Sequence, residues 1–435
     1  MKHLFEKTTD IKRVGIITSG GDCGGLNAFL YGAIMTALNS NIEPIIIPSG
    51  NIGMYNLINY NEDEIIPATI EMAESIDITR CGSSAGNTRA KIHKIDDSKA
   101  WERVLAGVKK HRLDAFVICG GDGSGRESLR YVEHGIKCVH APKTMDLDMQ
   151  SYSVGADSAI NKIAKVIGDA KTTGETHGRV LIIEVFGAKT GHIALRGGLA
   201  ANADAILIPE VAYDLGIVYE DLKRSLFERI YNSPTSTGTY VIVVAEGLKE
   251  TEKRPGDGGA TGAGAIIAER LKKMMADDKE IPKLMKKARL FVPGVNERPE
   301  IRDVVPLYIA RSGDTTALDI NFGLEIGSGS IFALLQGLSG VTILGINKRN
   351  VNYMQTVEAI KKRKVNKNRV ALYEYMGFCF GRNTKAFEPI LNEVKKPPIR
   401  LYYEQTLFKR IGFLFILYLY YEVLFLHNTT QKTIK

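Results

Sequence analysis

Short apolar runs rich in β-branched residues alternate with amphipathic helical patterns along most of the chain. The run RVGIIT (13–18) leads into a glycine turn and an amphipathic pattern over 26–38, and DAFVICGGDGS (114–124) leads into a second such pattern. Similar runs recur at 179–185, 205–210 and 239–247. This repetition is typical of a mostly parallel sheet covered by helices on both faces, whose ligands lie beyond the carboxyl ends of the strands.

The length of the chain and the distribution of its charge bear on the number of domains and on nucleic-acid binding. The chain has 435 residues, 44% of them hydrophobic, which is ample for two α/β domains. The formal charge of +8 comes from residues 351–435, which carry +9, whereas residues 1–350 carry −1. We therefore expect no nucleic-acid partner, and we interpret the basic run KKRKVNKNR (361–369) as a solvated surface, with polyanion binding as the alternative.

The cysteines and the two ends of the chain bear on localisation. Five cysteines without a CxxC pair indicate neither a disulfide framework nor a zinc site, and fit a reducing cytoplasm. The first residues lack the apolar stretch of a secretory signal. The apolar segment 411–426 is shorter than the roughly 20 residues of a membrane span and contains Glu422, so we expect a packed terminal helix, with a membrane-surface segment as the alternative.

Two of the strand ends are suited to bind phosphate. In TSGGDCGGLN (18–27), Gly20 and Gly21 let an anion approach the backbone closely, and the following helix offers its amide groups, although a plain turn would have the same composition. The turn from Gly120 to Gly125 adds Asp122, an oxygen ligand suited to Mg²⁺. Neither turn has the GxGxxG spacing of a dinucleotide fold, which argues against a dehydrogenase.

The stretch PKTMDLD (142–148) supplies two further carboxylates. If it is extended, Asp146 and Asp148 lie on the same face, where their like charges call for a cation or a transferred proton. We predict that Asp146 acts as the base for an acceptor hydroxyl and that Asp148 joins Asp122 in holding Mg²⁺. The alternative is a pair of aspartates that cap a turn.

Taken in order, these motifs resemble the phosphofructokinase family from about Val14 to about Ile346. GIITSGGDCGGLNA and GGDGS are similar to its two nucleotide loops, and PKTMDLD to its catalytic motif. HGRVLIIEVFGAKTGHIAL, IPE and IRDVVPLYIARSGDTTALD are similar to its sugar-phosphate segments.

The resemblance implies phosphorylation of fructose 6-phosphate at its 1-hydroxyl. Asp146 would be the base, with Thr144 and Lys143 beside the transferred group. The donor would lie on Gly20, Gly21, Gly120, Gly121, Gly123 and Ser124. The resemblance places the sugar phosphate on Arg179, Phe186, Gly187, Glu210, Arg302, Tyr308 and Arg311, with Arg179 reaching a neighbouring subunit of a homo-oligomer.

The same resemblance implies two three-layer αβα domains with mostly parallel sheets and the active site in the cleft between them. Residues 1–155, with 311–350 returning, would form the donor-binding domain and residues 156–310 the sugar-phosphate domain. Residues 351–435 would form a C-terminal extension, basic and then apolar.

Two positions bear on the identity of the phosphoryl donor, and they point to different donors. Pyrophosphate users of the family commonly carry an aspartate where this chain has Gly123, whereas a lysine at the position of Lys143 is common among them. We favour ATP, because a glycine removes a steric and electrostatic block to the nucleotide. Pyrophosphate is the alternative donor.

Several departures from the family pattern leave a second class of function open. Leu147 replaces an asparagine, Phe186 a methionine, Tyr308 a histidine, and Ala85 and Ala188 stand where arginines are usual. In addition, Glu127 stands where a small residue normally flanks the nucleotide, and Arg89 or Arg80 could replace the arginine missing at Ala85. A catalytically weak regulatory subunit that binds nucleotide and sugar phosphate is therefore the alternative to an active kinase.

Overall fold

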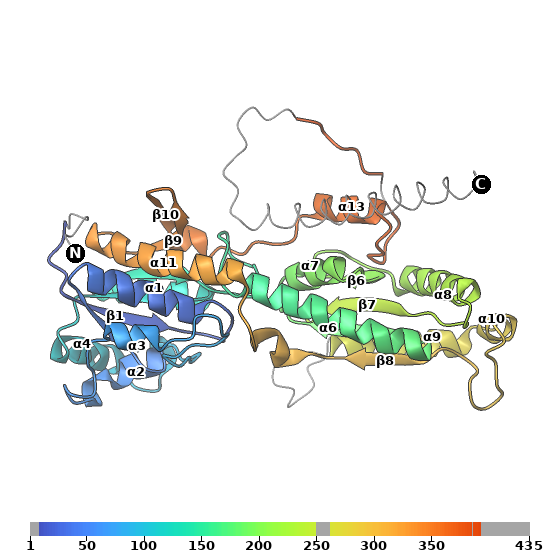
Figure 1. The fold of residues 1–435 in the computed structure, drawn as a ribbon, viewed down its shortest axis with the longest axis horizontal. Coiled ribbons are helices and arrows are strands. Elements are labelled where there is room, and N and C mark those ends of the chain that lie inside the picture. Colours follow the sequence, from blue (N-terminus) through green and yellow to red (C-terminus); the bar gives the residue numbers. More distant parts are fainter. Residues whose placement is uncertain (1–7, 249–261, 385, 393–435) are drawn as a thin grey trace, which may run out of the picture. The chain divides into compact units, whose positions relative to one another are not determined.

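The computed structural model describes residues 8–248, 262–384 and 386–392. Residues 1–387 form one compact unit, which contains two β-sheets (Figure 1). Of the second unit, residues 388–435, only 388–392 are described. The apolar segment 411–426, and with it any membrane contact of the tail, lies outside the described residues.

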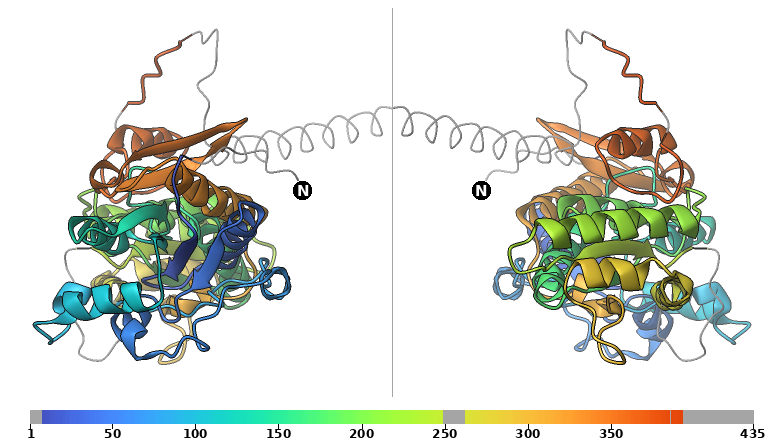
Figure 2. Two further views of the ribbon diagram at one scale, coloured as in Figure 1. Left: turned by 90° about the vertical axis from the view of Figure 1, so that its left-hand side faces the viewer. Right: turned by 90° about the vertical axis from the view of Figure 1, so that its right-hand side faces the viewer.

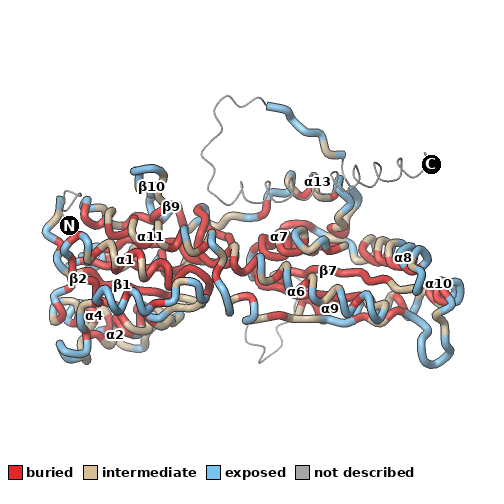
Figure 3. Tube along the Cα trace, viewed as in Figure 1, coloured by how far each residue is buried: buried red, intermediate tan, exposed pale blue. Residues whose placement is uncertain are grey.

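The first sheet has six strands in the order β10-β9-β4-β3-β1-β2. All neighbours are parallel except β9 and β10, which form an antiparallel hairpin at the edge. The strands are β1 (Arg13–Thr18), β2 (Glu43–Ile46), β3 (Ala115–Gly120), β4 (Lys137–Pro142), β9 (Val341–Asn347) and β10 (Asn350–Gln355). The six residues of β3 are all buried, as expected for a central strand of a parallel sheet covered on both faces. The neighbouring β1 is buried at every position after its first (Figure 3).

Helices cover both faces of the first sheet (Figure 2). On one face α1 (Leu26–Asn39) packs on α11 (Ala317–Leu335), which also contacts β4 and β9. On the other face lie α5 (Asp122–Glu133) and α4 (Ala100–Lys110), over a core that includes Phe116, Ile118 and Tyr131. Shorter helices complete the layers: α2 (Asn51–Asn56), η1 (Leu57–Asn59), α3 (Ile70–Glu74), η2 (Ile92–Lys94) and α12 (Thr356–Ala359).

The second sheet is wholly parallel, with four strands in the order β6-β7-β5-β8. They are β5 (Val180–Val185), β6 (Ala205–Leu207), β7 (Tyr240–Ala245) and β8 (Ile301–Val304). Alternate residues of β5 enter two different cores, because Val180 and Ile182 pack on one face and Leu181 and Ile183 on the other. The covering elements are α6 (Ala156–His177), α7 (His192–Ala200), α8 (Leu215–Asn232), α9 (Ala263–Asp277), α10 (Ile281–Lys287), η3 (Leu307–Arg311) and α13 (Lys367–Tyr375).

The observed architecture confirms the predicted α/β fold with parallel sheets. One difference concerns residues after 350, which we expected to form an extension. β10 belongs to the first sheet, and Cys379 forms an isolated parallel bridge with Ala205 in the second. Polar residues of β10 are mostly exposed, as suits an edge strand, and their lack of an apolar run hides the strand from a sequence pattern.

In the described part of the chain, one helix, α11, is long and apolar enough to cross a membrane by length and composition alone. Most of that helix is buried inside the protein against α1 and β9. A buried core helix has the same composition as a membrane span, so α11 is weak evidence for a membrane.

Candidate active site

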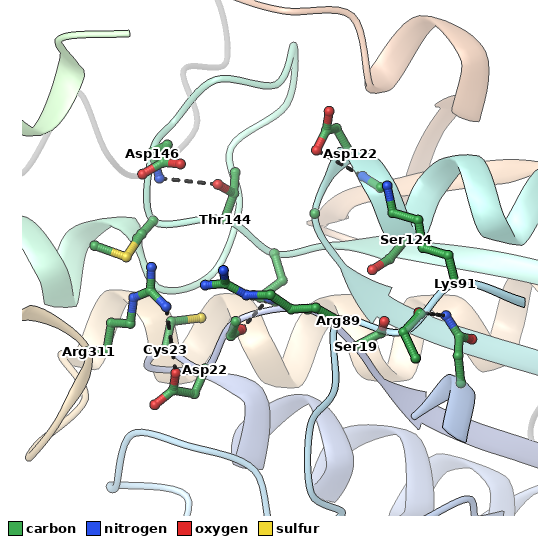
Figure 4. A pocket seen from close by; sticks show the side chains of 18 residues that line it. Ser19, Asp22, Cys23, Arg89, Lys91, Asp122, Ser124, Thr144, Asp146 and Arg311 are labelled. Carbon is green, nitrogen blue, oxygen red and sulfur yellow. Dashed lines mark hydrogen bonds and ion pairs between the residues drawn. The ribbon is translucent and has the colours of Figure 1, made fainter. Parts of the chain in front are cut away.

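A cavity of about 320 Å³ lies where the carboxyl ends of β1, β3 and β4 meet. The loops that follow these strands supply most of its lining, and Arg311, from η3, closes one side (Figure 4). Ten of the predicted residues line it: Gly20, Gly21, Gly121, Asp122, Gly123, Ser124, Lys143, Thr144, Asp146 and Arg311. The parallel topology therefore brings together residues more than 100 positions apart in the chain.

The loop after β1 keeps a backbone that only glycine adopts easily. Gly20 has a φ of 92°, and its amide donates to the Thr88 carbonyl at 2.8 Å. A Cβ atom on Gly21 would lie 3.0 Å from Nη1 of Arg311 and 3.4 Å from Nη2 of Arg89. Two guanidinium groups thus approach this loop, which gives the predicted phosphate site positive charge.

The loop after β3 places Asp122 at the first position of α5. Its Oδ1 accepts from the Gly123 amide at 2.8 Å, and its Oδ2 accepts from Arg126 at 2.8 Å. The turn has no space for a larger residue at Gly120, since a Cβ there would lie 2.1 Å from Oγ of Ser124. His140 also holds the turn, because its Nε2 lies 2.9 Å from the Gly120 carbonyl.

The segment after β4 is a turn rather than the extended segment that we expected. β4 ends at Pro142, and Leu147 has a φ of 52°, a conformation that is strained for leucine and better tolerated by the asparagine that the resemblance leads one to expect there. Oγ1 of Thr144 accepts from the Asp146 amide at 3.2 Å and donates to Asp148 at 3.5 Å. The alternation argument was therefore wrong, although the two aspartates still lie close enough to repel each other.

Burial, and after it the charge of the neighbouring Asp148, raises the pKa of Asp146 from 3.8 to about 6, although Arg311, Lys362 and Lys143 act in the opposite direction. Asp146 is partly exposed in the cavity, whereas Asp148 is 6% exposed. A carboxylate with a pKa near 6 is ionised at neutral pH and still has a useful affinity for a proton, which suits a general base.

Arg311 is held by two aromatic rings. Its guanidinium carbon lies 4.5 Å from the ring centre of Phe186 and 5.5 Å from that of Tyr308. Its Nε is buried without a hydrogen-bond partner among the described residues, and its ion pair with Asp22 is long, at 3.9 Å. Phe186 and Tyr308, two of the departures from the family pattern, thus contact the same cation, which retains hydrogen-bonding capacity for an anion.

Two further sequence questions have structural answers. Arg89 lines the cavity on the side of Arg311 (Figure 4), whereas Arg80 pairs with Asp77 and its side chain is 75% exposed. Arg89 is therefore the group that can replace the arginine missing at Ala85. Glu127 is fully buried and accepts from the Ile92 amide at 2.9 Å and from Arg130 at 3.0 Å, so it does not line the cavity.

Lys143 lines the cavity, whereas Gly187 does not. The Lys143 side chain is 4% exposed, and its Nζ donates to the Gly21 carbonyl, so its charge is fixed beside the first glycine loop. Gly187 follows β5 with a φ of 142°, and its amide donates to Oε1 of Glu246 at 3.2 Å.

Glu246 is a candidate that the sequence analysis missed. Burial raises its pKa to about 7, and the nearby Asp146 contributes in the same direction. It follows β7 directly, and β7 pairs with β5, so the end-of-strand argument used for the other motifs could have found it.

The carboxylate of Glu210, the predicted sugar ligand, accepts hydrogen bonds from backbone amides: Gly191 donates to it at 3.0 Å and Val365 at 3.1 Å. Contact of Glu210 with a sugar stays a prediction.

Arg179 and Arg302 lie at the amino-terminal ends of β5 and β8, and neither lines the cavity. Arg179 precedes β5, Arg302 is near the start of β8, and both pair with Glu300. The expectation that Arg302 faces the same pocket as Arg311 is not met within one chain. Arg302 instead accompanies Arg179, the residue expected to reach a neighbouring subunit.

Asp122 and Asp148 converge on one point, since both contact the ammonium group of Lys362, with Asp122 at 3.2 Å. The described residues contain no cluster of three acidic, histidine or cysteine side chains for a metal. Two converging carboxylates nevertheless fit Mg²⁺, which usually takes one or two carboxylates and completes its shell with water and substrate phosphates. Lys362 lies in the basic run that we expected to be solvated, and that expectation was wrong for this residue, whose side chain is 30% exposed.

Comparison with known proteins agrees with the site. The family model described as phosphofructokinase matches residues 13–334. The chain is 32% identical over 248 residues to the ATP-dependent 6-phosphofructokinase of Streptococcus mutans, covering 56% of this chain and 68% of that protein. It is 29% identical over 336 residues to the pyrophosphate–fructose 6-phosphate 1-phosphotransferase of Dictyoglomus thermophilum, covering 76% and 88%. The pyrophosphate-dependent phosphofructokinase of Marinobacter aquaeolei has a similar fold, with a TM-score of 0.64, 19% identity and coverage of 90% and 97%.

Proposed function

Because the chain belongs to the phosphofructokinase family, we propose that it transfers a phosphoryl group from ATP to the 1-hydroxyl of fructose 6-phosphate. The observation that carries the proposal is the placement of Asp146 and Arg311 in one cavity with two glycine loops. A base, a cation and backbone amides for phosphate are the parts that phosphoryl transfer to an alcohol requires.

The acceptor hydroxyl would donate its proton to Asp146 as its oxygen attacks the terminal phosphorus of the donor. The pKa of about 6 keeps Asp146 ionised at neutral pH, so it is ready to accept that proton. Thr144 holds the backbone at Asp146 in place, because its Oγ1 accepts from the Asp146 amide. Negative charge that spreads over the transferred group would be balanced by Arg311, Arg89 and Lys143.

Asp122 and Asp148 would hold Mg²⁺, which when bound neutralises charge on the donor phosphates. The donor phosphates would lie on Gly20, Gly21, Gly120, Gly121, Gly123 and Ser124. Ser124 opens onto the cavity from the first turn of α5, where the helix N-terminus favours an anion.

Glu246 is the acidic side chain that we place nearest the sugar, because it lies in the electrostatic field of Asp146. The same region includes Phe186 and Tyr308, whose rings contact Arg311. It also includes Gly187, whose amide donates to Glu246. Arg179 and Arg302, held together by Glu300, would serve the sugar phosphate of a neighbouring subunit. A homo-oligomer is therefore part of the proposal, and a reducing cytoplasm suits its five free cysteines.

ATP is the proposed donor because Gly123 leaves room beside the phosphates. A Cβ at Gly123 would lie 3.5 Å from Lys91 Cε, an ordinary contact, so the glycine is not demanded by packing. One observation favours pyrophosphate as a second candidate: the buried Lys143 supports the loop that would hold a short donor.

A donor screen tests the proposal. Purified protein with Mg²⁺ and fructose 6-phosphate is given ATP or pyrophosphate, and formation of fructose 1,6-bisphosphate is followed by coupled enzymes. We expect turnover with ATP and much slower turnover with pyrophosphate. The reverse preference would replace the donor assignment, and no turnover with either would leave the weakly active regulatory subunit as the better account.

A further inference from the structure

A segment far along the chain contacts two aspartates of the candidate active site, Asp122 and Asp148. We call residues 359–366 the strap, which connects α12 to α13. Its backbone is fixed at three places: the Gln150 amide donates to Ala359 at 3.0 Å, the Arg363 amide donates to Asp148 at 2.8 Å, and the Val365 amide donates to Glu210 at 3.1 Å. The first two bonds tie the strap to the loop that carries Asp146 and Asp148, and the third ties it to Glu210.

Consecutive basic side chains of the strap point in different directions. Lys361 turns outward, pairs with Glu358 and has a side chain that is 59% exposed. Lys362 turns inward, and its ammonium group contacts Oδ2 of both Asp122 and Asp148. Arg363 caps the Leu147 carbonyl at 3.1 Å. The inward position of Lys362 therefore follows from the backbone bonds on both sides of it.

The ammonium group of Lys362 forms ion pairs with both carboxylates, since its Nζ donates to Oδ2 of Asp148 and lies 3.2 Å from Oδ2 of Asp122. The carboxylate oxygens that it contacts are those that would bind a magnesium ion, whose bonds to oxygen are about 2.0–2.1 Å long. An ammonium group and a divalent cation do not fit between the same two oxygens at once, so they exclude each other.

We propose that Lys362 is a built-in competitor of the divalent cation, which neutralises Asp122 and Asp148 in the empty site and withdraws when the metal binds. The inference rests on the proposed function only in taking these two aspartates as the metal ligands. Withdrawal needs only a rotation of the lysine side chain, because the strap backbone stays bonded to Asp148 and Glu210. The displaced ammonium then remains beside the cavity, where donor phosphates would lie.

Binding of Mn²⁺ to the protein without donor or acceptor tests this directly. Free Mn²⁺ is measured by electron paramagnetic resonance for wild type, Lys362→Met and the matched control Lys361→Met, which removes the same charge from the adjacent, outward-facing position. We expect Lys362→Met to bind Mn²⁺ about tenfold more tightly or better, as removal of a like charge at contact distance predicts, and Lys361→Met to stay within about twofold of wild type.

A second variant identifies where the metal binds. Adding Asp148→Asn to Lys362→Met should remove the gain in Mn²⁺ affinity, because the shared carboxylate is lost. Unchanged or weaker Mn²⁺ binding by Lys362→Met would overturn the proposal, as would an equal gain in Lys361→Met, which would show a general charge effect. Retention of the gain in the double variant would also overturn it.

Thermal unfolding provides an independent readout of folding. Without metal, Lys362→Met should unfold at a lower temperature than wild type, because two neighbouring carboxylates lose their cation. Excess Mg²⁺ should raise its unfolding temperature more than it raises that of wild type; an equal rise in both would contradict the proposal. If Lys362→Met does not fold without metal, Lys362→Gln is titrated with the same expectation. None of these measurements depends on catalysis. An inactive protein would therefore contradict the proposed function without affecting this test.

Discussion

Replacing the proposed base, Asp146, by asparagine should make the folded protein more stable at neutral pH while it removes activity. Burial and the nearby Asp148 raise the pKa of Asp146 to about 6. The ionised carboxylate therefore has a higher free energy in the folded protein than in the unfolded chain. Asparagine keeps the shape of the side chain and has no charge to bury, so the cost disappears.

The size of the effect follows from the shift in pKa from 3.8 to about 6. Between these values the folded protein binds more protons than the unfolded chain, so stability contributed by this group is present at low pH and falls as pH rises. From the linkage relation, ionisation of Asp146 lowers the free energy of unfolding by about 1.6 kcal/mol at pH 5 and by about 3 kcal/mol at pH 8. These are upper limits, because Asp146 keeps partial contact with solvent in the cavity.

Urea unfolding at pH 5 and pH 8 measures the effect as the difference in unfolding free energy between Asp146→Asn and wild type. We expect stabilisation at both values and a larger one at pH 8. Asp169→Asn is the control, since Asp169 is an exposed carboxylate in a surface ion pair with Lys165 and should change stability by less than about 0.5 kcal/mol at either pH. Destabilisation of Asp146→Asn at pH 8, or an equal gain at both values, would refute the reasoning.

Three further predictions concern activity. Phe186→Ala and Tyr308→Ala should each lower kcat/KM for fructose 6-phosphate by roughly 2- to 30-fold, because each loses a cation–π contact with Arg311 worth about 0.5–2 kcal/mol. Phe291→Ala, which removes a comparable contact with Lys286, should leave kcat/KM unchanged; equal losses in all three would contradict a role for the rings around Arg311. Gly123→Asp should lower kcat/KM for ATP by about tenfold or more through charge repulsion, and should lower kcat/KM for pyrophosphate much less. Donor kinetics measure both values, and an unchanged kcat/KM for ATP would contradict this prediction. The pH profile of kcat/KM should fall on the acid side with a midpoint near 6 as Asp146 becomes protonated, whereas a flat profile down to pH 5 would exclude Asp146 as the base.

Much of the fold could be predicted because buried parallel strands are continuous apolar runs. β3 and β5 have no exposed residue, so apart from the buried Glu184 their sequences are apolar, and each leads into a glycine turn. β10 has no such run, because it lies at the edge of the sheet with mostly exposed residues, and it was missed. The same edge position hides the strap that follows it, since a solvated basic loop and the strap have the same composition.

The candidate site could be predicted where each residue sits in a local motif after a strand. Asp122, Lys143 and Asp146 are such residues, and the structure brings all three to one cavity. Contacts between distant segments could not be predicted, because one sequence holds no information on pairing. Examples are the Lys362 contact with Asp148, 214 positions away, and the amide of Val365 that occupies Glu210.

The central claim is that Asp146 accepts the proton of the acceptor hydroxyl at a site that binds fructose 6-phosphate independently of this base. The most direct test compares wild type and Asp146→Asn in the formation of fructose 1,6-bisphosphate from ATP, with binding of fructose 6-phosphate measured by calorimetry on both proteins. The account predicts turnover by wild type, a loss of roughly 10²–10⁴-fold in kcat for the variant, and similar binding by both. Equal rates in the two proteins would contradict it.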